Sequence, residues 1–359
     1  MTEPPRISVA ELADGVVHGP LLDEAGQVHE PLLVVDLDGD VPESALERAA
    51  ARAGDCGRLL AGIAAGPLTG RVRPLAAALD LTLTAAGDAP QSVTVADPVA
   101  AMRVLGRAVT DNPQASLVLG QVLRIAEALP VSAALDVESF AYSTLLGGPE
   151  FRRWLDRRGV RPPSPPSPLS PPSRPAERPV IVRQDGSRLQ ITLNQPERRN
   201  AYSRQLRDAL TDALRAALLN PAITRVVLDG AGPCFCSGGD LDEFGTAPDL
   251  ATAHFVRTQA GAGPLIHALG DRIEARVHGP CIGAGLELAA FAGTVVAAEG
   301  STFRLPETGM GLIPGAGGTV SVARRIGRWR TLCLALAGRP LAVPTALAWG
   351  LVDLVDHAS

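Results

Sequence analysis

The chain has 359 residues, which at about 150 residues per domain indicates two domains with enough core to fold without disulfide staples. The formal net charge is −5, whereas a general nucleic-acid-binding protein is usually basic. Aromatic residues make up only 3%, which leaves little material for stacking on bases. Length, charge and composition therefore favour a two-domain globular protein and disfavour nucleic acid as a partner.

The cysteines and the apolar stretches indicate the cellular compartment in which the protein is expected. The five cysteines are odd in number, and the closest pair, Cys234 and Cys236, is spaced more tightly than the usual zinc-binding pair. The N-terminus has no apolar signal region, and no apolar stretch reaches the roughly 18 to 20 residues needed to span a bilayer. We therefore expect a soluble, cytoplasmic protein with reduced thiols, no metal and no membrane partner.

A segment rich in proline and serine divides the chain. Residues 161–179 cannot pack into a core, and polyproline II geometry would make them a semi-rigid linker. Tracts of this kind also dock into SH3-type grooves, but the linker interpretation is preferred because a domain lies on each side. The expected domains are residues 1–160 and residues 180–359.

The spacing of apolar residues predicts strands and helices in alternation. In the first half we expect a strand at 32–36, a helix at 42–53, a strand at 59–64 and helical stretches within 98–159. In the second half we expect a hairpin of 180–183 and 189–193, a helix after Ser203, a strand at 225–228, a helix at about 249–269, a strand at 273–277, a short helix from 284, a strand at 294–298 and two further helical stretches. This alternation is typical of the α/β class.

Standard catalytic signatures are missing from the sequence. There is no phosphate-binding P-loop, no dinucleotide-binding glycine motif and no serine-hydrolase elbow, because Phe235 stands where the elbow needs its first glycine. The six histidines lack metal-ligand spacing, and His278 is expected to have a loop or capping role. P-loop, serine-hydrolase and metal chemistry are therefore disfavoured.

Two glycine-rich turns remain as candidate sites. In residues 235–241 and 279–287, small residues allow the backbone to approach a ligand, and each turn is expected to lead into a helix with free N–H groups. Two such N–H groups that converge would form an oxyanion hole. Each cluster taken alone is more often an ordinary tight turn.

Two carboxylates accompany these turns. Glu287 lies in an otherwise apolar helix, where a solitary charge is costly unless it is functional or paired. Glu307 precedes another glycine-rich run. For either residue alone, a surface or ion-paired carboxylate is the more ordinary interpretation.

Taken together, the segments resemble the enoyl-CoA hydratase/isomerase, or crotonase, superfamily. Five motifs occur in the family's order: Arg199-Asn200-Ala201, the turn at 235–241, Gly283-Ala284-Gly285-Leu286-Glu287-Leu288, Leu305-Pro306-Glu307 and the run at 311–319. The resemblance implies a spiral of ββα units, an acyl-CoA thioester as substrate and a homo-oligomer, usually a trimer or a dimer of trimers.

The resemblance also assigns roles to individual residues. The backbone N–H groups of Gly239 and Ala284 would form the oxyanion hole for the thioester oxygen, although the family usually has Gly where Ala284 stands. Glu287 and Glu307 would manage a water molecule and its proton. Four residues would contact the CoA nucleotide: Arg199, Ala201, Ser237 and Gly239.

The function implied is that of an enoyl-CoA hydratase, a lyase of fatty-acid metabolism that adds water across the 2,3 double bond. It needs no cofactor, because coenzyme A is part of the substrate. Alternatives are another crotonase reaction, namely isomerisation, decarboxylation, hydrolysis or oxygenation, or a non-catalytic acyl-CoA-binding protein.

The first half is expected to be a degenerate copy of the second. A shift of 213 residues aligns Gly66-Pro67 with Gly279-Pro280, but it places Pro74 opposite Glu287, so the copy should be inert. Residues 112–158 resemble the family's C-terminal helices, which do not follow residue 350 in this sequence. We therefore expect residues 112–158 to pack against the catalytic half, in the same chain or from a neighbouring subunit.

Overall fold

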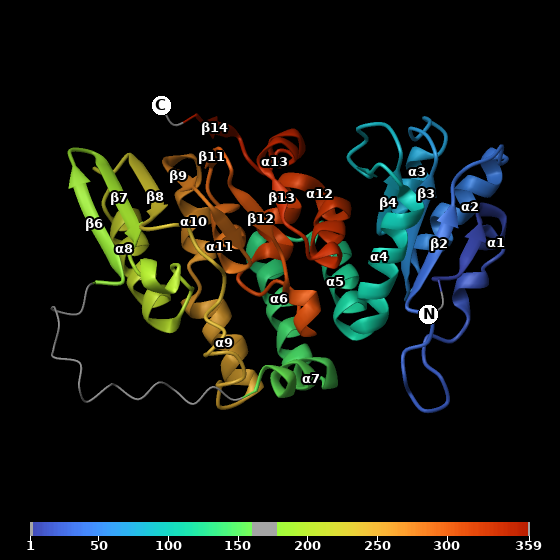
Figure 1. The fold of residues 1–359 in the computed structure, drawn as a ribbon, viewed down its shortest axis with the longest axis horizontal. Coiled ribbons are helices and arrows are strands. Elements are labelled where there is room, and N and C mark those ends of the chain that lie inside the picture. The colour runs from blue at the N-terminus through green and yellow to red at the C-terminus, as the bar shows by residue number, and fades with distance from the viewer. Residues whose placement is uncertain (1–2, 160–177, 358–359) are drawn as a thin grey trace.

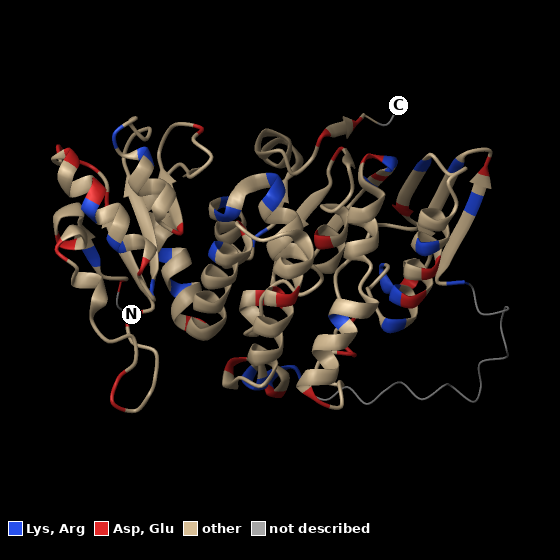
Figure 2. Ribbon diagram, turned by 180° about the vertical axis from the view of Figure 1, so that it is seen from behind, with Lys and Arg blue, Asp and Glu red and all other residues tan. Residues whose placement is uncertain are grey.

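The computed structural model describes residues 3–159 and 178–357, so nearly all of the expected linker at 161–179 lies outside the described residues. Acidic and basic positions are interspersed along both halves (Figure 2). Among the described residues, no helix combines the length and the apolar character that crossing a bilayer requires.

The first half is built on a five-stranded, fully parallel sheet in the order β1-β2-β3-β4-β5. Its elements are β1 (Arg6–Ser8), α1 (Val9–Ala13), β2 (Leu32–Asp36), α2 (Glu43–Gly54), β3 (Leu59–Ala64), α3 (Arg73–Ala78), β4 (Leu81–Thr84) and β5 (Val93–Thr94). Four helices follow: α4 (Pro98–Asp111), α5 (Pro113–Ala126), α6 (Val131–Leu146) and α7 (Pro149–Arg158). The strands β2 and β3 read as continuous apolar runs because both faces of a parallel sheet are covered.

The second half contains a six-stranded sheet in the order β14-β11-β9-β8-β7-β6, parallel except for the β6–β7 hairpin, and a three-stranded sheet in the order β10-β12-β13. Its strands are β6 (Val180–Asp185), β7 (Arg188–Leu193), β8 (Arg225–Gly230), β9 (Ile273–Val277), β10 (Pro280–Ile282), β11 (Thr294–Ala298), β12 (Thr302–Arg304), β13 (Leu341–Ala342) and β14 (Leu354–Asp356). Its helices are α8 (Arg204–Leu219), α9 (Leu250–Ala260), α10 (Gly263–Leu269), α11 (Ala284–Ala289), α12 (Gly318–Ala337) and α13 (Val343–Trp349), with a 3₁₀ turn η4 (Glu307–Met310). The predicted α/β class is confirmed.

Two local expectations were wrong. The single helix expected at 249–269 is broken into α9 and α10, because Gly261 is extended (ψ 145°) and Pro264, in the first turn of α10, has no N–H to continue the helix. The helix expected directly after the turn at 235–241 is absent, since residues 240–249 form turns and bends until α9 begins.

Helices from the first half pack against the second half in the same chain. Figure 1 shows α5 beside α12, and α6 and α7 beneath the elements around α11 and α12. Arg328 and Trp329 of α12 both donate to the carbonyl of Leu79, at 3.1 and 3.0 Å, and one hydrophobic core contains buried residues of both halves. Helix α5 also contacts α12, and α6 contacts α9, so the expected packing of residues 112–158 on the catalytic half is observed, and it is intramolecular.

Candidate active site

The first glycine-rich turn is held in place by a buried asparagine. Asn200 adopts a left-handed backbone (φ 52°), and its side-chain oxygen accepts from the N–H of Gln195 at 2.8 Å. Its amide nitrogen donates to three backbone carbonyls at 2.9 to 3.0 Å: those of Ala231, Cys234 and Phe235. This side chain therefore fixes the path of the backbone just before Gly239.

The two glycine-rich turns lie against each other. The N–H of Ile282 donates to the carbonyl of Cys236 at 3.1 Å, and a Cβ placed on Gly285 would come within 2.5 Å of the same oxygen. Only glycine fits position 285 at this separation. The N–H groups of Gly239 and Ala284, one from each turn, have no hydrogen-bond partner among the described residues, since Ala284 opens α11.

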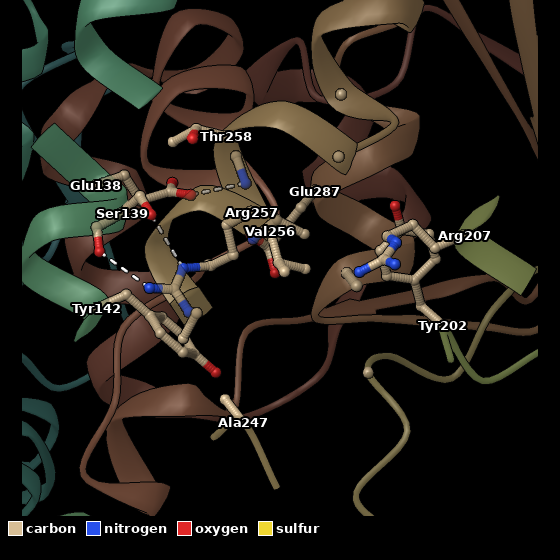
Figure 3. Close-up of a pocket in the computed structure, with 18 of the residues that line it drawn as sticks. Glu138, Ser139, Tyr142, Tyr202, Arg207, Ala247, Val256, Arg257, Thr258 and Glu287 are labelled. Carbon is tan, nitrogen blue, oxygen red and sulfur yellow. Dashed lines mark hydrogen bonds between the residues drawn. The ribbon is translucent and has the colours of Figure 1, made fainter. Parts of the chain in front are cut away.

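A cavity of about 920 Å³, shown with Glu287 in Figure 3, brings the predicted catalytic residues together. Gly239, Ala284, Glu287 and Glu307 all line it. Two walls come from α6 of the first half and α9 of the second, which lie side by side. The arrangement places two free backbone donors and two carboxyl groups on one cavity.

Glu287 is buried on α11 and faces the cavity, with its side chain only 2% exposed. Its Oε2 accepts from the N–H of Ala316 at 2.7 Å and from that of Gly318 at 2.8 Å. Burial raises the pKa of this carboxyl well above its ordinary value, and the nearby Glu307 and Glu138 raise it further, while the two N–H bonds oppose the shift.

Glu307 begins η4, and it is buried where it lines the same cavity as Glu287. Its Oε2 has no hydrogen-bond partner among the described residues. Burial raises the pKa of Glu307 to about 8, so this carboxyl holds its proton at neutral pH. A protonated, unpartnered oxygen of this kind is suited to donate to a ligand.

A third buried glutamate reaches the site from the first half. Glu138 of α6 accepts from the N–H of Gly317 at 2.8 Å and from both the N–H and the hydroxyl of Thr319, at 2.9 and 2.7 Å. Burial raises its pKa to about 7, and the hydrogen bonds from Thr319 and Gly317 oppose this shift. The described residues contain no group of three His, Cys, Asp or Glu side chains arranged to hold a metal ion.

The residues predicted to contact CoA are adjacent to this cavity but only partly line it. The N–H of Ser237 donates to the carbonyl of Arg199 at 3.0 Å, and Ala201 lies two residues further along the same loop. Of the four, only Gly239 is among the lining residues. The neighbouring Tyr202 and Arg207 line the wall opposite α6 and were not predicted (Figure 3).

Comparison with known proteins is consistent with this geometry. A sequence model of the enoyl-CoA hydratase/isomerase family matches residues 183–358. The 2,3-dehydroadipyl-CoA hydratase of Escherichia coli is 35% identical over 174 residues, which cover 48% of this chain and 68% of that protein. The 1,2-epoxyphenylacetyl-CoA isomerase of the same organism is 34% identical, over 46% of this chain and 65% of that protein. The chain belongs to the enoyl-CoA hydratase/isomerase family.

The match is confined to the second half. The chain spans about two thirds of the length of the curated relatives it matches, from 62% to 69% among those most similar. A solved enoyl-CoA hydratase subunit from Geobacillus kaustophilus is 30% identical and covers 50% of this chain and 69% of that one, with a TM-score of 0.47. Family membership confirms the predicted crotonase-like class for residues 183–358, while the origin of residues 1–160 stays a prediction.

On the wall formed by α6 and α9, the polar cavity residues Glu138, Tyr142 and Arg257 were also missed as site candidates. Glu138 carried a usable signal, because it is a carboxylate in a largely apolar helix, as Glu287 is. Tyr142 and Arg257 carried none, since nothing in the local sequence indicates that α6 and α9 face the same space.

Proposed function

We propose that the enzyme is an enoyl-CoA hydratase that adds water across the 2,3 double bond of an enoyl-CoA thioester. The observation that carries this proposal is the presence of two buried carboxyl groups, Glu287 and Glu307, on the same cavity as the free N–H groups of Gly239 and Ala284. Family reactions that use one acid or none would not require both.

The two N–H groups would polarise the thioester carbonyl. Drawing electrons toward that oxygen makes C3 of the enoyl group electrophilic and makes C2 basic, in the manner of an enolate. An oxyanion donor is worth roughly 3 kcal/mol in comparable enzymes. Because both donors are backbone groups, Ala284 serves as well as the glycine usual in the family.

The hydrogen bonds and the burial support Glu287 as the general base and Glu307 as the general acid. In its ionised form Glu287 would take a proton from the attacking water, since the two N–H bonds to its Oε2 hold it on the cavity and oppose the rise in its pKa that burial causes. Glu307 would give its proton to C2, since burial raises its pKa to about 8 and its Oε2 is unpartnered. Water would thus add its oxygen to C3, and the two carboxyls would exchange one proton to complete the cycle.

We also propose that the first half is a degenerate copy of the catalytic half. Support comes from strand order, because β1 to β5 are parallel neighbours in sequence order, as are β7, β8, β9, β11 and β14. The shift of 213 residues brings β3 onto β9 and β4 onto β11. No carboxylate corresponds to Glu287 in this register, so the copy would act by supplying α6 and α7 to the shared cavity.

Incubation with a panel of enoyl-CoA thioesters tests the proposal. We expect loss of the conjugated enoyl absorbance, with a 3-hydroxyacyl-CoA as the product. A double-bond shift without water addition, or thioester cleavage to free CoA, would contradict the hydratase assignment.

A further inference from the structure

Arg257 of α9 and Tyr142 of α6 form one polar wall of the cavity. The guanidinium carbon of Arg257 lies 4.6 Å from the centre of the Tyr142 ring, which is a cation–π contact. Its Nε donates to the hydroxyl of Ser139 at 3.1 Å, and its Nη2 donates to Ser139 and Ser143. Figure 3 shows this pair facing Tyr202 and Arg207 across the cavity.

The pair leaves two donors without a partner. Among the described residues, no hydrogen bond uses Nη1 of Arg257, and no carboxylate oxygen lies within 4.0 Å of its guanidinium nitrogens. Glu138, whose charge acts on Arg257, already accepts hydrogen bonds at both oxygens, from the N–H groups of Gly317 and Thr319 and from the Thr319 hydroxyl. The hydroxyl of Tyr142 also has no partner there, although this residue is only 7% exposed.

Both residues line the cavity, where a ligand can satisfy these donors. Burial lowers the pKa of Arg257, which shows that the surroundings disfavour its charge in the absence of an anion. Arg and Tyr donors side by side suit a planar, negatively charged acceptor such as a carboxylate. The bonds of Nε and Nη2 are enough to hold α9 against α6. Nη1 and the Tyr142 hydroxyl take no part in that contact, so they can donate to a ligand.

The wall adjoins the proposed reaction centre. The Tyr142 ring is so close to Gly315 that a Cβ there would lie 2.4 Å from the ring, and the next residue, Ala316, donates to Glu287. A group bound by Arg257 and Tyr142 therefore lies in the same cavity as the two catalytic carboxyls, where it would belong to the acyl part of the substrate.

We propose that Arg257 and Tyr142 bind a carboxylate at the far end of the acyl chain, so that the substrates are enoyl-CoA thioesters with a terminal carboxyl group. This inference rests on the proposed function, because only an acyl-CoA substrate that reacts at Glu287 and Glu307 would extend its acyl chain toward Arg257 and Tyr142. Nη1 of Arg257 and the Tyr142 hydroxyl donate to the two oxygens of that carboxylate.

Binding of unreactive ligands tests this separately from catalysis. Saturated acyl-CoA thioesters of four to eight carbons, each paired with its ω-carboxyl counterpart, cannot be hydrated, and calorimetry gives their Kd values. For at least one chain length we expect the ω-carboxyl ligand to bind about tenfold more tightly or better, as a charge-assisted pair of hydrogen bonds allows. Equal or weaker binding of every ω-carboxyl ligand by the wild-type protein would overturn the proposal.

Variants assign the preference to the two residues. The quantity compared is the Kd of the unsubstituted ligand divided by the Kd of its ω-carboxyl counterpart. Arg257→Gln should reduce this ratio by about tenfold, and Tyr142→Phe should reduce it by a smaller factor. Arg48→Gln, on the exposed face of α2, should leave the ratio unchanged. A ratio unaffected by both cavity variants would also overturn the proposal. If Arg257→Gln fails to fold, the wild-type ratio and Tyr142→Phe decide. A preference for ω-carboxyl ligands without any hydration would contradict the proposed function alone, and hydration with equal binding would contradict this inference alone.

Discussion

Glu138 and Glu287 hold alternate N–H groups of one short stretch of backbone. In residues 316–319, the first and third N–H groups donate to Glu287 and the second and fourth donate to Glu138, all at 2.7 to 2.9 Å. Glu287 belongs to the catalytic half and Glu138 to the first half. The position of a proposed catalytic carboxylate therefore depends on a side chain from the other half of the chain.

Substitution of Glu138 should impair turnover through Glu287. Glu138→Gln keeps the size of the side chain but turns an N–H donor toward backbone N–H groups, so the stretch at 316–319 should shift. We expect kcat to fall about tenfold or more, the pH profile of kcat to move, and KM to change little. The measurement is a steady-state pH profile of the wild type and the variant.

The control for this variant is Glu47→Gln, at an exposed position of α2. A purely structural role for Glu138 would lower the amount of folded enzyme without moving the pH profile of the remaining activity. An unchanged profile with a full kcat would show that Glu287 does not depend on Glu138.

Glu287→Gln and Glu307→Gln should each remove most turnover and leave the fold and acyl-CoA binding nearly intact. The amide preserves the volume of the side chain but can neither accept nor supply the required proton. General acid–base groups of this kind contribute about 10² to 10⁴-fold. Rates from the enoyl absorbance assay and Kd values from calorimetry check both parts, and near-wild-type turnover in both variants would exclude the two-glutamate mechanism.

Gly239→Pro should cost more activity than Gly239→Ala, because proline removes the donor N–H itself. Loss of one oxyanion donor is expected to lower kcat by about 10² to 10³-fold. Alanine keeps the N–H, although its Cβ would lie 3.1 Å from the Phe244 ring, so a modest loss is expected. Calorimetric unfolding confirms that both variants are folded, and equal activities would refute the role of this N–H.

The buried glutamates should make the protein less stable as pH rises. Burial raises the pKa of Glu307 to about 8 and that of Glu138 to about 7, whereas an unfolded glutamate titrates near 4.5. Between these values the folded state keeps protons that the unfolded state has lost, so stability is fully present below pH 4.5 and declines until about pH 8. Each such proton costs roughly 1 kcal/mol per pH unit.

Glu307→Gln isolates this effect, because the amide cannot titrate. Between pH 5 and pH 8 its Tm should fall less steeply than that of the wild type, and scanning calorimetry at several pH values measures both slopes. A parallel decline in the two proteins would mean that Glu307 is ionised in the folded state as readily as in the unfolded chain.

Much of the second half could be predicted because its signals are local. The strand at Thr294–Ala298 has the predicted bounds, and the predicted cap Ser203 accepts from the N–H of Leu206 at 3.2 Å. Apolar runs, caps and glycine turns are set by neighbouring residues, so a single sequence displays them. The break at Gly261 and Pro264 is also a local signal, although the sequence analysis expected one helix across it.

The rest depends on contacts between distant segments. Glu138 binds N–H groups about 180 residues away, and Arg257 meets Tyr142 only because α9 and α6 pack side by side. Local patterns do not encode such pairs, so the contact of Glu138 with residues 316–319 and the polar wall could not be derived from spacing. The short strands β10 and β12 were missed for a similar reason, since they pair with each other across a long connection.

Hydration carried out in D₂O tests the central claim most directly. If Glu287 activates water and Glu307 protonates C2, an enoyl-CoA should give a 3-hydroxyacyl-CoA with one solvent-derived deuterium at C2, detected by mass spectrometry and NMR. The Glu307→Gln variant should give almost no such product. An enoyl-CoA recovered unchanged or with its double bond moved, or a 3-hydroxy product formed equally well by the variant, would contradict the account.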